Sequence, residues 1–252
     1  MMIWKKSKEV VLDCLTIDDS IAEHFPIKET TYFKSQAMKD IPKRKERKTR
    51  SEEYATLSSA QSAPRLNHPQ YCIGFNDLMK YGFVLPWWTE TFLQGNLVDN
   101  EYRINFDAAH PHQAHLFHYG LNPEEYAEYQ RKVDSVVARI ECPWKIKAND
   151  KTFFLHTNCW VHNMKNTFMP LNGVLEFWWN NTANAVVAIT KQNNLRHHFN
   201  PGEPLIQFIP LEKVNLKIKI HVVDQKTFFS RTSSDKFFYN KLQKLRQWSL
   251  KK

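Results

Sequence analysis

The chain has 252 residues, of which 42% are hydrophobic and 24% are charged, and its net charge is +9. This composition is enough for one large or two small domains with a real core, and it argues against a disordered chain. No run approaches the roughly 18 apolar residues that a membrane-spanning helix needs, which argues against a membrane protein. The first residues contain no apolar segment typical of a secretory signal.

The positive charge is concentrated in two segments. Residues 39–50 carry a net charge of +5, and residues 236–252 contain six basic residues and no acid. The basic patch of the first segment is formed by Lys43, Arg44, Lys45, Arg47, Lys48 and Arg50. Two interpretations stay open, namely contact with nucleic acid or an anionic partner, and a solvated linker followed by a solvated helix face.

The cysteines are far apart and include no Cys-x-x-Cys pair. They are Cys14, Cys72, Cys142 and Cys159. A zinc site made of cysteines alone is therefore not expected, and reduced thiols are the simpler interpretation.

Short elements are predicted in the N-terminal segment, residues 1–35, which is expected to pack on the core. A strand is predicted at 9–17. One or two helical turns follow, up to Phe25, and three residues can cap them: Asp18, Asp19 or Ser20. Extended structure is predicted again at 30–33.

A β-rich core domain is expected at 71–225. It follows a long segment, residues 36–70, that is first basic and then polar and is interpreted as a loop or linker. A short helix is predicted at 72–80, with Gly82 near its C-terminal end.

A hairpin is predicted next. Residues 83–93 are expected to form one strand, with Pro86 marking an edge position or a bulge. Gly95-Asn96 is expected to form the turn, and 101–106 the second arm.

A helix is predicted at 122–138. Asn122 can cap it, Pro123 suits its first position, and a glutamate follows at the third. Apolar side chains continue at helical spacing through Tyr126, Tyr129, Val133, Val136, Val137 and Ile140.

The remainder of the core is expected to be β-structure. Residues 143–150 and 151–163 are predicted to form a hairpin around an Asn-Asp turn. Residues 214–222 alternate between apolar and polar side chains, which predicts one buried and one wet face. A basic helix is predicted at 226–252.

Residues 143–210 resemble the β-clip core of trimeric dUTPases and dCTP deaminases. The stretch from Gly173 to Pro210 holds the sequences GVLE and GEPLIQ, which start 29 residues apart. They resemble the family motifs Gly-Val-Ile-Asp and Gly-Asp-Arg-Ile-Ala-Gln. The resemblance implies a β-clip fold and a nucleotide as ligand.

The same resemblance points to particular residues and also departs from the family. An Asp of the family activates water and an Arg holds the triphosphate. Here the nearest acid is Glu176, the candidate catalytic base, and His156-Thr157-Asn158 replaces the family's Arg-Ser. We therefore expect the fold without the activity, with no catalytic residue and no cofactor, and we assign His156, Asn158 and Gln207 to a ligand or partner surface.

A second resemblance covers roughly residues 9–213. The motifs CIGFNDLMKYGFVLPWWTE, PWKIKANDKTFFLHTN, LNGVLEFWW and NPGEPLIQFIP are similar to those of a family of uncharacterised proteins encoded by tailed bacteriophages, with bacterial cousins. This resemblance implies a phage origin and a location in the host cell cytoplasm or in the virion.

Four histidines in close succession are candidate metal ligands: His110, His112, His115 and His118. Neutral imidazoles bind metals well, but no single regular element presents all four together. Further ligands would have to come from Asp107, His156 or His162. We expect no metal site and interpret these histidines as surface or packing residues of a loop.

Two tryptophan pairs complete the expected partner surface: Trp87, Trp88, Trp178 and Trp179. If each pair lies in a strand, one ring points into the core and its neighbour points outward. The outward ring is available to a sugar, a base or a protein partner. The alternative is that both rings are covered.

These observations predict an α+β fold, a mostly antiparallel β-barrel or sandwich of β-clip or jelly-roll type with a few peripheral helices. They favour a non-enzymatic phage accessory protein that binds a virion or host protein through an aromatic and basic surface. The alternative is a nucleotide-binding or nucleotide-pyrophosphatase-like protein with a rebuilt site. No membrane contact is expected; nucleic-acid contact through 39–50 and oligomerisation stay open.

Overall fold

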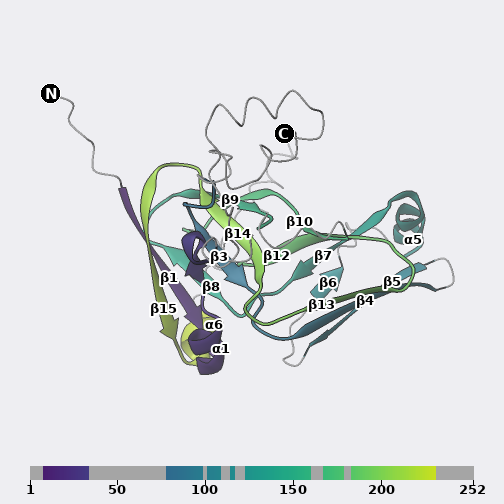
Figure 1. Cartoon of the computed structure of the whole chain (residues 1–252), viewed down its shortest axis with the longest axis horizontal. Coiled ribbons are helices and arrows are strands. Elements are labelled where there is room, and N and C mark those ends of the chain that lie inside the picture. Colours follow the sequence, from purple (N-terminus) through teal and green to yellow (C-terminus); the bar gives the residue numbers. More distant parts are fainter. Residues whose placement is uncertain are drawn as a thin grey trace, which may run out of the picture.

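The strands of the described residues lie in four sheets (Figure 1), which share one hydrophobic core. The computed structural model describes residues 8–33, 78–98, 101–108, 114–116, 123–159, 167–178 and 183–230. Helices within these ranges are short: α1 (Asp19–His24), α5 (Pro123–Lys132) and α6 (Gln225–Ser230). No helix of the described ranges is long and apolar enough to cross a membrane.

The first sheet joins strands from opposite ends of the described chain. Strand β1 (Lys8–Thr16) lies between β15 (Val214–Val222) and β8 (Lys145–Ala148). It runs parallel to β15 along its whole length and antiparallel to β8. In Figure 1 this sheet lies at the left, with α1 and α6 at its lower end.

The five-stranded sheet contains β14 (Pro204–Pro210), in which every residue except Pro210 is buried. The other strands, in the order β11-β9-β14-β3-β2, are β11 (Gly173–Glu176), β9 (Phe153–Thr157), β3 (Phe83–Pro86) and β2 (Lys28–Glu29). One face of this sheet carries aromatic rings into the core. The rings of Phe83 and Phe208 stack there with centroids 4.8 Å apart.

The two remaining sheets are entirely antiparallel. The four-stranded sheet has the order β10 (Phe168–Pro170), β12 (Ala185–Thr190), β7 (Ser135–Ile140) and β6 (Ala114–Leu116). The three-stranded sheet has the order β13 (Leu195–Phe199), β4 (Thr91–Val98) and β5 (Glu101–Ala108).

Most local predictions for the chain ends are confirmed. The strand expected at 9–17 is β1, and the alternating run 214–222 is β15, with Asn215, Lys217 and Lys219 exposed. The cap of α1 is Asp18, whose Oδ1 accepts a hydrogen bond from the backbone N–H of Ile21 at 3.1 Å. Residues 30–33, by contrast, are helical and not extended.

The mostly antiparallel α+β architecture is confirmed, and β1 with β15 is a parallel exception. The closed barrel is not found, because the described strands divide among separate sheets.

The helix predicted at 122–138 is only half correct. Helix α5 ends at Lys132, and Ser135–Ile140 form strand β7. Within β7 the residues Val136, Ala138 and Ile140 are buried, which is the period of a strand. Pairing of this segment with β12 provides hydrogen-bond partners for its backbone, and its β-branched valines favour a sheet.

Two predicted hairpins are wrong or shifted. Residues 83–93 divide into β3 and β4, which lie in different sheets, and β8 and β9 likewise lie in different sheets. Gly95-Asn96 was expected to form a turn but lies within β4, because that strand continues to Val98, which pairs with Glu101 of β5. A register shift does occur opposite Pro86, between Pro204 and Ile206 of β14.

Several predictions fall outside the described residues. They are the linker at 36–70, most of the short helix at 72–80, and the helix at 226–252 beyond the end of α6. Gly82, expected near the end of the short helix, has a φ of +91°. This left-handed conformation suits glycine.

Candidate functional site

The first tryptophan pair belongs to the core. Trp87 and Trp88 are 0% and 3% exposed, so neither contributes to a partner surface. The prediction of one outward ring fails because the pair follows the end of β3 and does not lie in a strand. The Trp87 ring stacks on Phe199 of β13 with centroids 4.6 Å apart. Trp178 is 37% exposed, and Trp179 lies outside the described residues.

The three polar residues assigned to a ligand surface lie near one another, but they are buried. Gln207 of β14 is paired with Thr157 of β9, next to His156, and Asn158 follows at the end of the strand. His156, Asn158 and Gln207 are 4%, 6% and 0% exposed. They are therefore internal polar groups and not an open surface.

Gln207 connects β14 to the segment before β3. Its Nε2 donates to the carbonyl oxygens of Leu78 at 3.2 Å and Tyr81 at 3.4 Å, and to Oγ1 of Thr30 at 3.4 Å. Its Oε1 has no hydrogen-bond partner. The amide thus stabilises backbone carbonyls that would otherwise be buried without a donor.

His156 is held neutral by its surroundings. Burial lowers the pKa of His156 to about 4, and a hydrogen bond with the backbone of Leu171 opposes this shift in part. The ring lies against Phe208, with centroids 5.2 Å apart, and its Nε2 has no hydrogen-bond partner. A charged imidazole is therefore disfavoured in the folded state.

This burial predicts a pH dependence of stability. Below pH 6.5 the unfolded chain protonates His156, whereas the folded chain does so only near pH 4. Stability contributed by this residue is therefore lost as the pH falls through that window, by about 3 kcal/mol in total. We expect His156→Gln to remove this slope in urea unfolding between pH 4 and 7. An unchanged slope would contradict the assignment.

Glu176, the candidate catalytic base, lies at the end of β11 opposite Phe153 of β9 and is half-buried. Among the ion pairs of the described residues, none involves Glu176. Within the described part of the chain, this carboxylate is thus not paired with a guanidinium of the kind that holds a triphosphate.

The candidate metal ligands and the predicted basic patch lie almost entirely outside the described residues. His110, His112 and His118 lie outside the described residues, and only the backbone of His115 is described, in β6. All residues of the basic patch at 39–50 lie outside as well. Within the described ranges, no group of three or more His, Cys, Asp or Glu side chains is arranged to hold a metal ion.

Among the described residues, Cys14 and Cys142 are free thiols. Cys14 and Cys159 are buried and Cys142 is partly buried. Burial raises the pKa of the Cys14 and Cys142 thiols, so both are protonated at neutral pH. A protonated thiol is a poor nucleophile.

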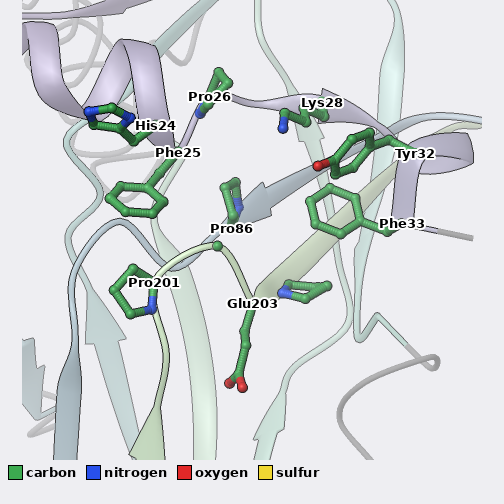
Figure 2. Close-up of a pocket in the computed structure, with 11 residues that line it drawn as sticks. His24, Phe25, Pro26, Lys28, Tyr32, Phe33, Pro86, Pro201 and Glu203 are labelled. Carbon is green, nitrogen blue, oxygen red and sulfur yellow. The ribbon is translucent and has the colours of Figure 1, made fainter. Parts of the chain in front are cut away.

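A pocket of about 360 Å³ lies where α1 and β2 meet the start of β14. Its walls are mostly rings: Phe25, Pro26, Tyr32, Phe33, Pro86, Pro201 and Pro204, with Gly202 and the polar residues His24, Lys28 and Glu203. We call it the α1–β2 pocket. Figure 2 shows Phe25 and Pro201 on one side, Tyr32 and Phe33 on the other, and Pro86 between them.

Backbone hydrogen bonds build the wall of this pocket around Gly202. The N–H of Gly202 donates to the carbonyl of Trp87 at 2.7 Å, and the N–H of Trp87 donates to the carbonyl of Glu203 at 2.8 Å. Gly202 has a φ of +85°, which lets the chain turn sharply between Pro201 and Pro204. Prolines on both sides restrict the corner, so the pocket wall is preorganised.

The charged side chains of Glu203 and Lys28 at the pocket differ in the partners they contact. The carboxylate of Glu203 accepts hydrogen bonds from Asn200, from the backbone N–H at 3.2 Å and from Nδ2 at 2.8 Å. Its side chain points away from Pro26 and Lys28 (Figure 2). The ammonium of Lys28 lies 3.9 Å from the centroid of the Tyr32 ring and makes no ion pair with a described residue. The pocket therefore offers one cation beside apolar rings.

Sequence reasoning missed this pocket because its residues come from three distant segments, near 24–33, at 86 and at 201–204. The available signal was the proline-rich corner NPGEP, which entered the predictions only as part of two family motifs. Comparison of the chain with protein-family models, with curated proteins and with solved structures finds no match. The pocket's own geometry therefore carries the functional argument.

Proposed function

We propose that the chain is a non-enzymatic binding protein of a tailed bacteriophage that engages a virion or host protein through the α1–β2 pocket. The observation that carries the proposal is a preorganised pocket with prolyl and aromatic walls and one uncommitted ammonium, that of Lys28. The motifs of residues 9–213 that resemble tailed-phage proteins support the phage assignment and a place in the infected cell or the virion.

The walls favour a ring as the inserted group. Phe25 and Tyr32 offer ring faces and edges and Pro26 and Pro201 offer flat apolar surface, while Phe33, Pro86 and Pro204 are buried. An aromatic or prolyl side chain buries its apolar area against such walls and loses little conformational entropy. The volume of about 360 Å³ is at the lower end of small-ligand pockets, which suits one such side chain and its neighbours.

The charge favours an acidic neighbour of that ring. Lys28 can pair with one carboxylate, because its ammonium is a compact point charge held at the rim by Tyr32. Glu203 does not compete, because both of its oxygens are bonded to Asn200. The ligand we propose is thus a partner segment in which an aromatic or prolyl residue is flanked by Asp or Glu.

A nucleotide fits this pocket less well. Triphosphates are usually held by several backbone N–H groups, arginines or a metal ion, whereas this pocket lines its cavity with Lys28 and His24 as basic residues. The nucleotide-binding alternative rests on Glu176 and on the resemblance of 143–210 to dUTPases. A thermal-shift measurement with nucleotides, described below, tests it.

The experiment uses fluorescein-labelled octapeptides with a central Trp, Phe or Pro flanked by Asp, and matched peptides flanked by Lys. We expect the full chain to bind the acidic peptides more tightly in fluorescence anisotropy. Lys28→Glu should weaken them about tenfold and reverse the preference toward the Lys-flanked set, because attraction becomes repulsion. Lys213→Glu changes the same charge at an exposed position after β14 and should have no effect.

Two outcomes would overturn the proposal. One is that neither peptide set binds, or that Lys28→Glu and Lys213→Glu behave alike. The other comes from a thermal-shift arm with deoxynucleoside triphosphates and Mg²⁺, in which a ligand at 100 times its Kd adds about 2.7 kcal/mol to the free energy of unfolding. A shift that Glu176→Gln abolishes would favour the nucleotide-binding alternative.

A further inference from the structure

The outer face of the β13-β4-β5 sheet has an unusual composition. The strands bury one face in the core. The other face presents Val98 at the end of β4 and eight further exposed side chains: Phe92, Gln94, Asn96, Arg103, Asn105, Asp107, Arg196 and His198. Each of the eight ends in a planar group, which is a ring, an amide, a carboxylate or a guanidinium. Among the described side chains, Val98 is the one exposed residue of this face that is β-branched, the kind that strands favour. We call this surface the planar-group face.

The register of the strands sets these groups in rows. His198, Phe92 and Asp107 are cross-strand neighbours. The next row along the strands is formed by Arg196, Gln94 and Asn105. The third row is formed by Asn96 and Arg103, and the hairpin continues to the pair Val98 and Glu101. Neighbouring strands are about 4.8 Å apart and rows about 7 Å, so the Cα positions cover roughly 10 by 13 Å.

Most of these polar groups are unused within the fold. Among the described residues, the side chains of Gln94, Arg103, Asn105, Asp107 and Arg196 have no hydrogen bond or ion pair. Asn96 only accepts a hydrogen bond from the backbone N–H of Asn194, at 3.1 Å. Planar side chains can make two coplanar hydrogen bonds each, so the face offers many unused donors and acceptors.

The phenyl ring of the face is held in place. Phe92 is 40% exposed and stacks on His198 with centroids 4.5 Å apart and planes inclined by 5°. Nε2 of His198 lies 2.8 Å from Oε1 of Glu90, which fixes the imidazole. A ring held upright on a sheet is a preorganised platform for a flat apolar ligand surface.

We propose that the planar-group face binds a neutral oligosaccharide. Neighbouring sugar hydroxyls both donate and accept, so they can pair with guanidinium, amide and carboxylate groups together, while the apolar face of a sugar ring packs on Phe92. Rows of such groups across three strands fit a chain of several sugar units lying across the sheet.

Charge favours a neutral glycan over a nucleic acid. On this face Arg103 and Arg196 are opposed by Asp107 and by the adjacent Glu90. Of the chain's net charge of +9, the segments 39–50 and 236–252 carry +5 and +6, which leaves −2 for all other residues. Nucleic-acid binding requires neutralisation of phosphates by a surplus of basic residues, and this face has little surplus.

The test starts with the labelled full chain on a microarray of neutral oligosaccharides, namely glucans, xylans, mannans, galactans and N-acetylglucosamine oligomers. Binding to at least one class is expected, and calorimetry with the soluble tetrasaccharide of that class then gives Kd. We expect Phe92→Ala and Arg196→Lys each to raise Kd about tenfold, because the first removes the platform and the second keeps the charge but loses the planar fork.

Matched controls change the same residue types elsewhere. Phe153→Ala removes an exposed ring of β9, and Arg131→Lys alters an exposed arginine of α5; both should leave Kd within twofold. All variants should keep the melting temperature of the unchanged chain. Lys28→Glu should also leave glycan binding intact, which separates this proposal from the proposed function.

The inference is overturned if the chain binds none of the glycans at millimolar concentration, or if the controls weaken binding as much as the two variants. It is also overturned if a single-stranded oligonucleotide binds this face in place of sugars. In that case affinity would fall with Phe92→Ala, decline steeply with salt, and survive Arg196→Lys, which keeps the charge.

Discussion

A Gly82→Ala variant is expected to lose at least about 3 kcal/mol in free energy of unfolding. Gly82 has a φ of +91°, where an alanine is disfavoured. A Cβ there would also lie 1.9 Å from the carbonyl oxygen of Phe208 and 2.9 Å from its carbonyl carbon. These are backbone atoms of β14, which is paired on both sides with β3 and β9. The strand cannot move away without losing hydrogen bonds, so the clash persists.

Two other glycines separate conformational strain from the clash. Gly202→Ala has the strain, with a φ of +85°, but its Cβ would meet only the Phe25 ring at 3.8 Å, so a loss of about 1–2 kcal/mol is expected. Gly173→Ala has no positive φ and one contact, at 3.8 Å, so it should be within about 0.5 kcal/mol of the unchanged chain. Urea unfolding followed by tryptophan fluorescence measures all three. Equal losses at Gly82 and Gly202 would show that the clash is absent.

Gln207→Glu is expected to destabilise the fold by about 3 kcal/mol or more at pH 7. The amide Nε2 donates to the carbonyl oxygens of Leu78 and Tyr81, and the side chain is 0% exposed. A carboxylate replaces this donor with an oxygen that repels both carbonyls, and it buries a charge without a partner.

The loss should depend on pH. Burial and the two carbonyl oxygens disfavour the charged form, so the carboxyl pKa of the folded variant is expected to lie above the ordinary value of about 4.3. Above that pH the unfolded chain releases its proton before the folded chain does, so stability falls as the pH rises. Each variant is compared with the unchanged chain at the same pH, which cancels the contribution of His156.

Gln207→Met is the matched control. It also removes the donor and leaves the carbonyls of Leu78 and Tyr81 without it, at a cost of about 1–3 kcal/mol, but it introduces no titrating group. The difference between the two variants should therefore grow from pH 4 to pH 8. Parallel stability curves across that range would mean that the carboxylate is solvated and that the site is not closed.

Features that depend on a few consecutive residues were predictable from the sequence. The alternation of 214–222 and the apolar run of 9–17 identified β15 and β1, because a strand with one wet face repeats every two residues. Asp18 was one of three expected caps for α1, because its short side chain reaches the free N–H groups of a first turn. The β-rich α+β class follows from the same local patterns.

The segment 133–140 shows where local pattern fails. Val133, Val136, Val137 and Ile140 satisfy helical spacing, yet Val136, Ala138 and Ile140 satisfy strand spacing equally well. Apolar periodicity over so few residues does not decide between the two. The antiparallel partner β12 decides, because it supplies the backbone hydrogen bonds of β7.

The candidate site was even less predictable. Trp87 and Trp88 are aromatic residues of the kind found at partner surfaces, but whether such a ring is exposed depends on what packs over it, here Phe199 and other core rings. Gln207 was predicted to lie on a ligand or partner surface. It is buried instead, since Thr30, Leu78 and Tyr81 enclose it.

The amino-acid sequence by itself determined the β-rich class and the strands at both ends of the core, and it limited the cap of α1 to three neighbouring residues, since each of these features depends on neighbours within a turn or a strand. The tertiary structure alone decided which strands pair, including β1 beside β15, and it assembled the α1–β2 pocket and the planar-group face from distant segments. The physical reason is that burial and hydrogen-bond partners are properties of surroundings, and in this chain the surroundings come from residues far away in sequence.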